Sequence, residues 1–141
     1  MKSKLRLVLV FIVLALLAGA VAWKFTFRKS ATSVGEKRSD VEITVAMLVQ
    51  AFESDEHAAN SMYLDKIVTV TGTVESVTTD PTVISVYLKE SDALAGVICS
   101  FDRNATGISS LHNGMQVSIK GICTGYLMDV VMNRCSLVSG F

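Results

Sequence analysis

The chain of 141 residues is half hydrophobic, and its thirteen basic and thirteen acidic residues give a formal net charge of zero. This length leaves room for one domain of about 100 residues with a modest core plus an appendage, and excludes a second domain of that size. The charges are unevenly divided. Residues 1–29 hold six basic residues and no acid, whereas from Glu36 onward seven Lys or Arg accompany thirteen Asp or Glu, a net charge of −6. The predicted folded part is therefore acidic.

An uncharged apolar run, "LVLVFIVLALLAGAVAW", occupies residues 7–23. As a helix it would be roughly 25 Å long, near the lower limit for crossing a bilayer, and basic residues on both sides can extend it. It predicts a transmembrane signal anchor behind a short basic cytoplasmic end, residues 1–6. A cleaved secretory signal is the alternative, because Ala20 and Ala22 resemble a cleavage site, although the run exceeds the usual signal core. Either interpretation exports the rest of the chain.

Residues 24–43 have mixed charge and no sustained period, which predicts a linker. A helical lead-in follows. Val45, Leu48, Val49 and Phe52 have the spacing of one apolar helical stripe behind a Thr44 cap. A second turn or helix is expected to begin at a Ser54 cap, with Asp55 and Glu56 where the helix dipole favours negative charge.

After Lys66 the hydrophobic period changes from that of a helix to two, the period of a half-buried strand. The last part of the chain, residues 44–141, is thus predicted to hold the lead-in and a β domain. An irregular break, "NATGISSLHNG", separates the third predicted strand from the fourth. The five predicted strands cover residues 66–77, 81–90, 96–102, 114–123 and 129–138.

Two of these strands contain a glycine in mid-strand, Gly72 in "KIVTVTGTVESV" and Gly121 in "VSIKGIC". A small closed barrel must bend its strands sharply, and a glycine permits the bulge or kink that makes the corner. Five short strands with an insertion between the third and fourth match an oligonucleotide/oligosaccharide-binding (OB) fold. The predicted fold class is therefore mainly β, a five-stranded Greek-key OB barrel. Another small β-sandwich or an open sheet is the alternative.

The segments "ANSMYLDKIVTVTGTVESV", "GVICSF" and "LHNGMQVSIKGICTGYLMDVVMNRCSLV", behind an apolar N-terminus, resemble the tRNA_anti-like family of bacterial OB-fold proteins over most of residues 44–138. The resemblance implies an OB barrel like the anticodon-binding domain of aminoacyl-tRNA synthetases. Nucleic-acid binding is implied by similarity, and no catalytic residue comes with it. For a bacterial protein, the anchor predicts a single-pass inner-membrane location with the C-terminal domain outside the cytoplasm.

OB barrels usually bind ligands on the outward face of the second and third strands, and nucleic-acid binders combine aromatic platforms with a basic groove. Glu90, Asp92 and Asp102 lie beside this face and would repel phosphate. We therefore favour a non-enzymatic, membrane-tethered module for an envelope protein, peptide or saccharide. Single-stranded nucleic-acid binding is the alternative, and Tyr87 and Tyr126 could also be ordinary surface tyrosines. The candidate ligand-binding residues are Tyr87, Lys89, Ser100, Arg103 and Tyr126.

No catalytic or metal motif occurs in the sequence, and no cofactor is expected. His57 lies in the helical lead-in and His112 in a turn, so both are expected at the surface. The three cysteines, Cys99, Cys123 and Cys135, lie in the exported part, where an oxidising compartment would allow one bridge. Because the third and fifth strands of an OB barrel are neighbours, Cys99 and Cys135 are the candidate pair. Three reduced thiols are the alternative.

Overall fold

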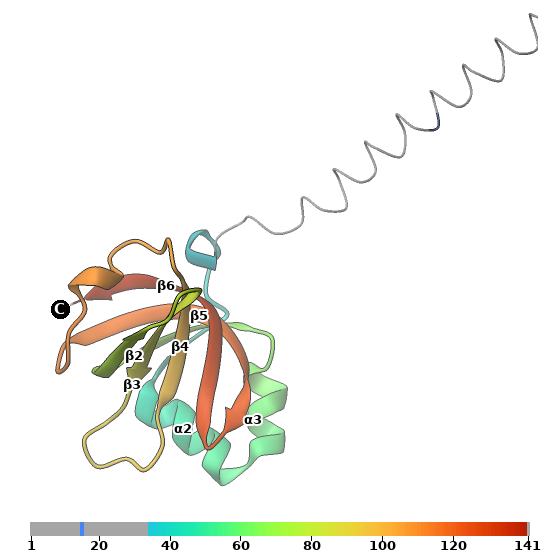
Figure 1. Cartoon of the computed structure of the whole chain (residues 1–141). Helices are drawn as coiled ribbons and strands as arrows, with labels where there is room; N and C mark the ends of the chain where they lie inside the picture. Colours follow the sequence, from blue (N-terminus) through green and yellow to red (C-terminus); the bar gives the residue numbers. More distant parts are fainter. Residues whose placement is uncertain (1–14, 16–33, 141) are drawn as a thin grey trace, which may run out of the picture. The chain divides into compact units, whose positions relative to one another are not determined.

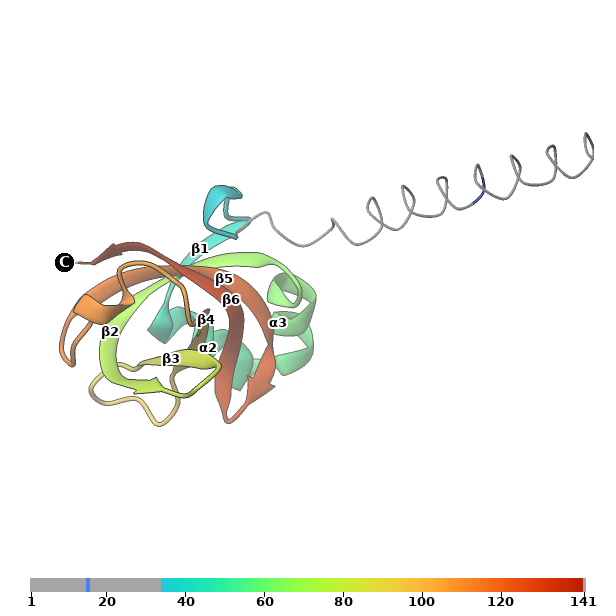
Figure 2. The same ribbon diagram turned by 45° about the horizontal axis from the view of Figure 1, so that its top comes forward.

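Five strands form the barrel: β2 (Ile67–Thr79), β3 (Val83–Leu88), β4 (Val97–Asp102), β5 (Gln116–Leu127) and β6 (Asp129–Gly140) (Figure 1). Their order is β2-β3-β4-β6-β5, and β5 pairs back onto β2, so the barrel closes. β4 and β6 run parallel, whereas the other barrel neighbours are antiparallel. Figure 2 shows the strands curving around a common interior. This arrangement confirms the predicted five-stranded OB barrel.

The structure is a computed structural model that describes Ala15 and residues 34–140. Apart from Ala15, the predicted span at residues 7–23 lies outside the described residues, as does the beginning of the predicted linker. Among the described residues, no helix has the length and apolar character needed to cross a membrane.

Residues 34–44, most of which composition assigned to the linker, belong to the folded unit. They contain a 3-10 helix, η1 (Val34–Glu36), and strand β1 (Val41–Thr44). β1 adds to the sheet in parallel with the first half of β2, from Val41 opposite Val68 to Thr44 opposite Thr71. The Lys120 ammonium fixes η1 by donating to the carbonyls of Gly35 (3.1 Å) and Lys37 (2.8 Å). Because η1 and β1 are only three and four residues long, they are too short to show a sustained period, which explains the linker assignment.

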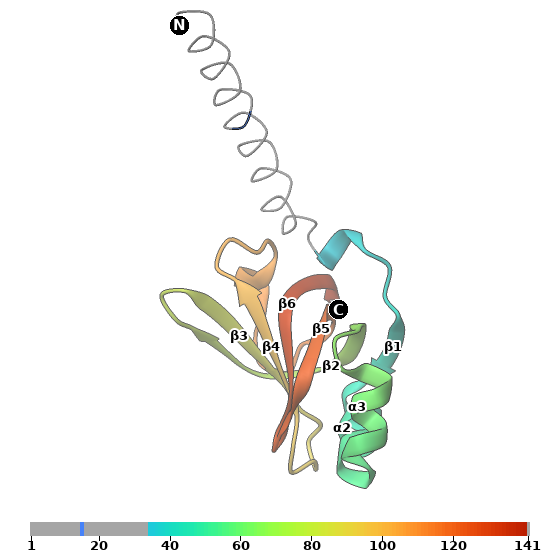
Figure 3. The ribbon, with the colours of Figure 1, turned by 90° about the vertical axis from the view of Figure 1, so that its right-hand side faces the viewer.

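Two short helices, α2 (Val45–Ser54) and α3 (Glu56–Tyr63), precede the barrel and lie at the end that carries the β5–β6 hairpin (Figure 3). Thr44 caps α2 as predicted, because its Oγ1 accepts from the Met47 N–H at 3.3 Å. The predicted Ser54 cap is wrong, since Ser54 is the last residue of α2. Asp55 caps α3 instead, accepting from the Ala58 N–H at 3.0 Å. A carboxylate is as good an N-cap acceptor as a hydroxyl.

The two mid-strand glycines differ in their surroundings. Gly72 pairs regularly with Val117, and the irregularity of β2 falls instead between Val74 and Ser76. A Cβ at Gly72 would overlap Cγ2 of Val45, so this glycine lets α2 approach the strand. Gly121 does lie at a register shift between β5 and β6, and a Cβ there would be 2.6 Å from Cys135 Sγ.

The barrel interior holds the alternate apolar residues that the period of two predicted. Val86 and Leu88 of β3, Phe101 of β4 and Ile119 of β5 are all fully buried or nearly so. In β6 no inward face could be predicted because both phases of the sequence are mixed. The structure gives the reason. Arg134 has a positive φ of 53° and the register shifts nearby, so that Met132 and Cys135, three residues apart, are both buried.

Candidate ligand-binding face

The outward face of β3 and β4 carries two of the predicted site residues side by side. Tyr87 is opposite Ile98, and Ser100 is opposite Ser85. All four side chains are half-buried. In the same register Ile98 is opposite Val131 of β6, so the face continues across a third strand. These outward residues form a shallow surface of mixed polarity, which we call the β3–β4 face.

Asp129 organises this face by bonding to two neighbouring segments. Its Oδ1 accepts from the Tyr87 hydroxyl at 2.8 Å and from the Gly96 N–H at 2.8 Å. Gly96 is needed for this arrangement, because a Cβ there would be 2.8 Å from Cε2 of the Tyr87 ring. The carboxylate therefore ties the beginning of β6 to β3 and to the loop before β4.

The environment of Tyr87 is acidic. Partial burial, the hydrogen bond to Asp129 and the negative charges of Asp129 and Glu75 raise the pKa of Tyr87 to about 12. Each of these effects disfavours the phenolate. Tyr87 is therefore a protonated donor at neutral pH, and its hydroxyl is already bonded to a carboxylate.

The predicted cations of the site do not converge. Lys89 follows the end of β3 where Leu88 pairs with Val97, whereas Arg103 follows the opposite end, where Val83 pairs with Asp102. The ladder between β3 and β4 consists of six residue pairs. Its two ends are therefore about 16 Å apart along the strands. Arg103 also donates from Nη1 to the Asp80 carbonyl at 2.7 Å, which fastens it to the β2–β3 turn.

Tyr126 lies apart from Tyr87. Its ring stacks on Phe52 of α2, with the ring centroids 5.5 Å apart and an interplanar angle of 18°. Its strand neighbour in β6 is the fully buried Val130. Tyr126 thus covers the end of the core and does not form a second platform beside Tyr87.

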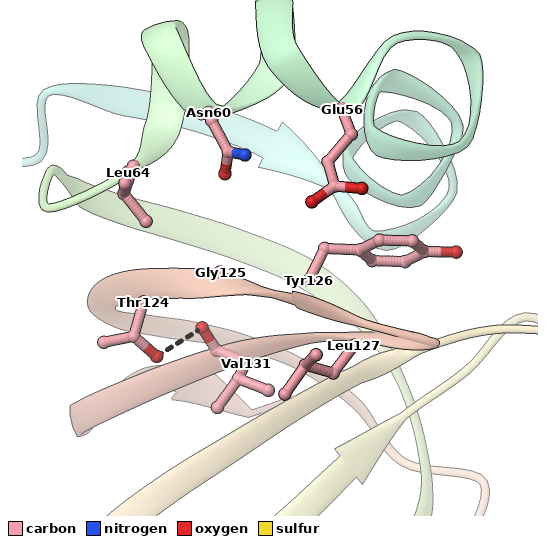
Figure 4. A pocket seen from close by; sticks show the side chains of 8 residues that line it. All are labelled: Glu56, Asn60, Leu64, Thr124, Gly125, Tyr126, Leu127 and Val131. Atoms are coloured by element: carbon pink, nitrogen blue, oxygen red, sulfur yellow. Dashed lines mark hydrogen bonds between the residues drawn. The ribbon is translucent and has the colours of Figure 1, made fainter.

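A groove of about 400 Å³ separates α3 from the β5–β6 hairpin (Figure 4). Glu56, Asn60 and Leu64 point from the helical side toward the hairpin. The opposite wall is formed by β5, where the Thr124 hydroxyl donates to the Val131 carbonyl at 3.1 Å. Because Val131 also belongs to the β3–β4 face, the face and the groove adjoin. The β-strand residues lining the groove are Thr124, Gly125, Tyr126, Leu127 and Val131.

The candidate cysteine pair lies inside the barrel. Cys99 and Cys135 are both buried on the neighbouring strands β4 and β6, and both thiols are free, as is Cys123. The thiol hydrogen bond with Cys135 and burial raise the pKa of Cys99 well above its ordinary value. A bridge between them stays a prediction. Within residues 34–140, no cluster of three or more His, Cys, Asp or Glu side chains could hold a metal ion.

Comparison with known proteins gives the family. The tRNA_anti-like family profile matches residues 1–137. The chain belongs to the tRNA_anti-like family. No curated protein sequence matched it.

Solved structures resemble this tRNA_anti-like chain to different degrees. A "putative nucleic acid-binding lipoprotein" of Klebsiella pneumoniae aligns with a TM-score of 0.61 and 18% identity, over 73% of this chain and 100% of that one. The aspartyl-tRNA synthetase of Entamoeba histolytica aligns with a TM-score of 0.45 and 12% identity, over 73% of this chain and 26% of that one. The asparaginyl-tRNA synthetase of the same organism aligns with a TM-score of 0.41 and 15% identity, over 55% of this chain and 21% of that one. At 18% identity, the likeness to the Klebsiella structure establishes the fold alone.

Sequence reasoning missed Asp129 and the α3 wall of the groove in the tRNA_anti-like domain. Asp129 stands alone in "LMDVV", and no local pattern indicates that it meets Tyr87, 42 residues away. The α3 wall was readable in principle, because Glu56, Asn60 and Leu64 recur at intervals of four, the spacing of one helix face.

Proposed function

We propose that this tRNA_anti-like protein is a non-enzymatic binding module of the bacterial envelope whose β3–β4 face recognises a protein, peptide or saccharide. The observation that carries the proposal is the bond between Tyr87 and the Asp129 carboxylate, with Glu75 also acting on the ring. An aromatic side chain held by acids suits a neutral or cationic ligand, whereas phosphates would be repelled. The net charge of −6 from Glu36 onward would also repel phosphates.

Single-stranded nucleic-acid binding is the second candidate, and two observations favour it. The family takes its name from tRNA recognition, and the Klebsiella lipoprotein is named for nucleic-acid binding. The arrangement of side chains argues against it. Sequence-independent binders align bases on successive aromatic rings along a cationic groove, whereas here Tyr126 is stacked on Phe52 and Lys120 is bonded to η1.

Salt dependence separates the two candidates, because phosphate binding releases counterions and weakens steeply as salt rises. The full chain, purified in non-ionic detergent, is titrated with a fluorescent single-stranded oligonucleotide at low and at physiological salt. We expect no saturable binding at either salt concentration. Saturable, salt-sensitive binding that is lost in Tyr87→Ala and Lys89→Glu, but retained in the control Lys66→Glu, would overturn the proposal in favour of nucleic-acid recognition.

The envelope location is part of the proposal and has its own test. It rests on the apolar run at residues 7–23 and its basic flanks. A reporter enzyme that folds only outside the cytoplasm, fused after Phe141, is expected to be active and to sediment with membranes. An inactive fusion contradicts the orientation, and an intact mass lacking the N-terminal segment identifies a cleaved signal instead of an anchor.

A further inference from the structure

The second half of β5 has a free strand edge facing the groove. From Val117 to Ile122 the strand lies between β2 and β6 and has partners on both sides, with a register shift on the β6 side at Gly121. Cys123 takes the last bonds on the β2 side, accepting from the Asp65 N–H at 2.8 Å and donating to the Lys66 carbonyl at 3.1 Å. Beyond it, within residues 34–140, the segment Thr124–Leu127 pairs only with β6.

The groove has room for another extended chain along this edge. Its volume of about 400 Å³ lies between the edge and α3 and falls in the range of ligand sites. At Gly125, in the middle of the edge, an added Cβ would meet nothing within 4 Å. A second backbone can therefore approach the one on β5 without displacing a side chain.

The chemistry of the lining indicates the class of occupant. Among the described residues that line the groove, Glu56 alone is charged, and Asn60 adds an amide. Leu64 and Leu127 supply apolar surface, and Leu127 is 84% exposed. A strand edge that has no ladder partner within residues 34–140, apolar positions and one carboxylate together fit an extended peptide with apolar side chains and a Lys or Arg.

We propose that the groove between α3 and Thr124–Leu127 binds an extended, basic peptide segment of a partner protein as an added strand on β5. The inference rests on the proposed function and narrows its ligand to a polypeptide. The peptide backbone pairs with the β5 edge, its cationic side chain meets Glu56, and its apolar side chains contact Leu64 and Leu127. The adjoining β3–β4 face, reached through Val131, contacts the residues beyond that segment.

The test selects ligands from a displayed library of random short peptides, using the full chain in non-ionic detergent. We expect enriched sequences with alternating apolar residues and at least one Lys or Arg. Glu56→Lys is expected to weaken a selected peptide by about tenfold or more, since it replaces attraction by repulsion. The matched control Glu42→Lys makes the same charge change on β1 and should leave binding unchanged. Circular dichroism verifies that both variants fold.

Two further measurements address the strand geometry itself. Because alternate residues of a strand bond to one neighbour, N-methylation of alternate peptide amides should abolish binding, whereas methylation of the intervening amides should not. Bound peptide should also slow amide hydrogen exchange within residues 124–127. Peptide binding that is indifferent to Glu56→Lys and to N-methylation overturns the groove site but leaves the proposed function intact. Absence of any peptide ligand, together with salt-sensitive oligonucleotide binding, overturns both.

Discussion

The two halves of β5 show how one strand can serve two purposes. From Val117 to Ile122 it has strand partners on both sides, and its inward residues Val117 and Ile119 are fully buried. From Thr124 to Leu127 it has a partner on one side only, and Leu127 is 84% exposed. The change occurs beside the beginning of β2, directly after the chain leaves α3.

This difference indicates where the domain can bind a partner without disrupting contacts that stabilise its fold. In the first half both edges of the strand are used by the fold, so little is left for a ligand. In the second half the hairpin is supported by β6 and by the Phe52–Tyr126 stack, while one backbone edge stays open. A barrel has no edges in principle, and this one regains an edge because β5 is longer than the part of β2 that pairs with it.

Substitutions in the two halves of β5 should differ most in how much they lower the free energy of unfolding. Ile119→Ala is expected to lower the free energy of unfolding by about 2 to 5 kcal/mol, because it leaves a cavity in the core. Thr124→Ala loses two exposed hydrogen bonds, one to the Val131 carbonyl and a long one from the Asn133 amide, and should cost about 1 kcal/mol or less. Urea unfolding of both variants makes the comparison. Equal losses would contradict the distinction between a structural half and a binding half.

The contact between Gly72 of β2 and Val45 of α2 is expected to give the next largest effect on the free energy of unfolding. A Cβ at Gly72 would overlap Val45, so Gly72→Ala is expected to lower the free energy of unfolding by about 1 to 3 kcal/mol. In the background of Val45→Ala the same substitution should cost less, because the overlapping methyl groups are gone. Additive losses in this double-mutant cycle would show that the two residues do not compete for space.

The sequence predicted the barrel better than the site, for physical reasons. The alternation of Val68, Val70 and Val74 reports burial on one face directly, since the core accepts only apolar side chains there. The candidate site needed contacts between distant segments. Tyr87 and Ser100 were correctly expected on one face because register follows from the hairpin. Tyr126 instead stacks on Phe52 of α2, a contact that local pattern does not specify.

The acidic surroundings of Tyr87 should be visible in its titration. The folded-state pKa of about 12 exceeds the ordinary value of 10.0. The stability that Tyr87 contributes is therefore fully present below pH 10 and is lost as pH rises toward 12. Asp129→Asn removes one negative charge, so the tyrosine pKa should fall toward 10. Absorbance of the phenolate, assigned by comparison with Tyr87→Phe, measures it, and an unchanged midpoint would mean that Asp129 does not act on the ring.

The last prediction, which has the smallest expected effect, concerns alkylation of the cysteines in the folded barrel. Burial and the raised pKa of Cys99 leave little thiolate, so an alkylating reagent should label this residue very slowly in the native protein. After unfolding without reductant, intact mass counts the free thiols. Three labels mean that Cys99 and Cys135 are a reduced pair, and one label identifies the predicted bridge.

Asp129 gives the two surfaces a common thermodynamic link. Its single oxygen Oδ1 holds both Tyr87 on the β3–β4 face and Gly96 in the neighbouring loop, while its backbone begins β6, the second strand of the hairpin. A ligand that draws the Tyr87 hydroxyl away from this oxygen would also loosen the turn of the hairpin, where Asp129 is opposite Leu127. By reciprocity, an occupant that orders the hairpin must change affinity on the face by the same factor. One carboxylate thus makes the two surfaces cooperative.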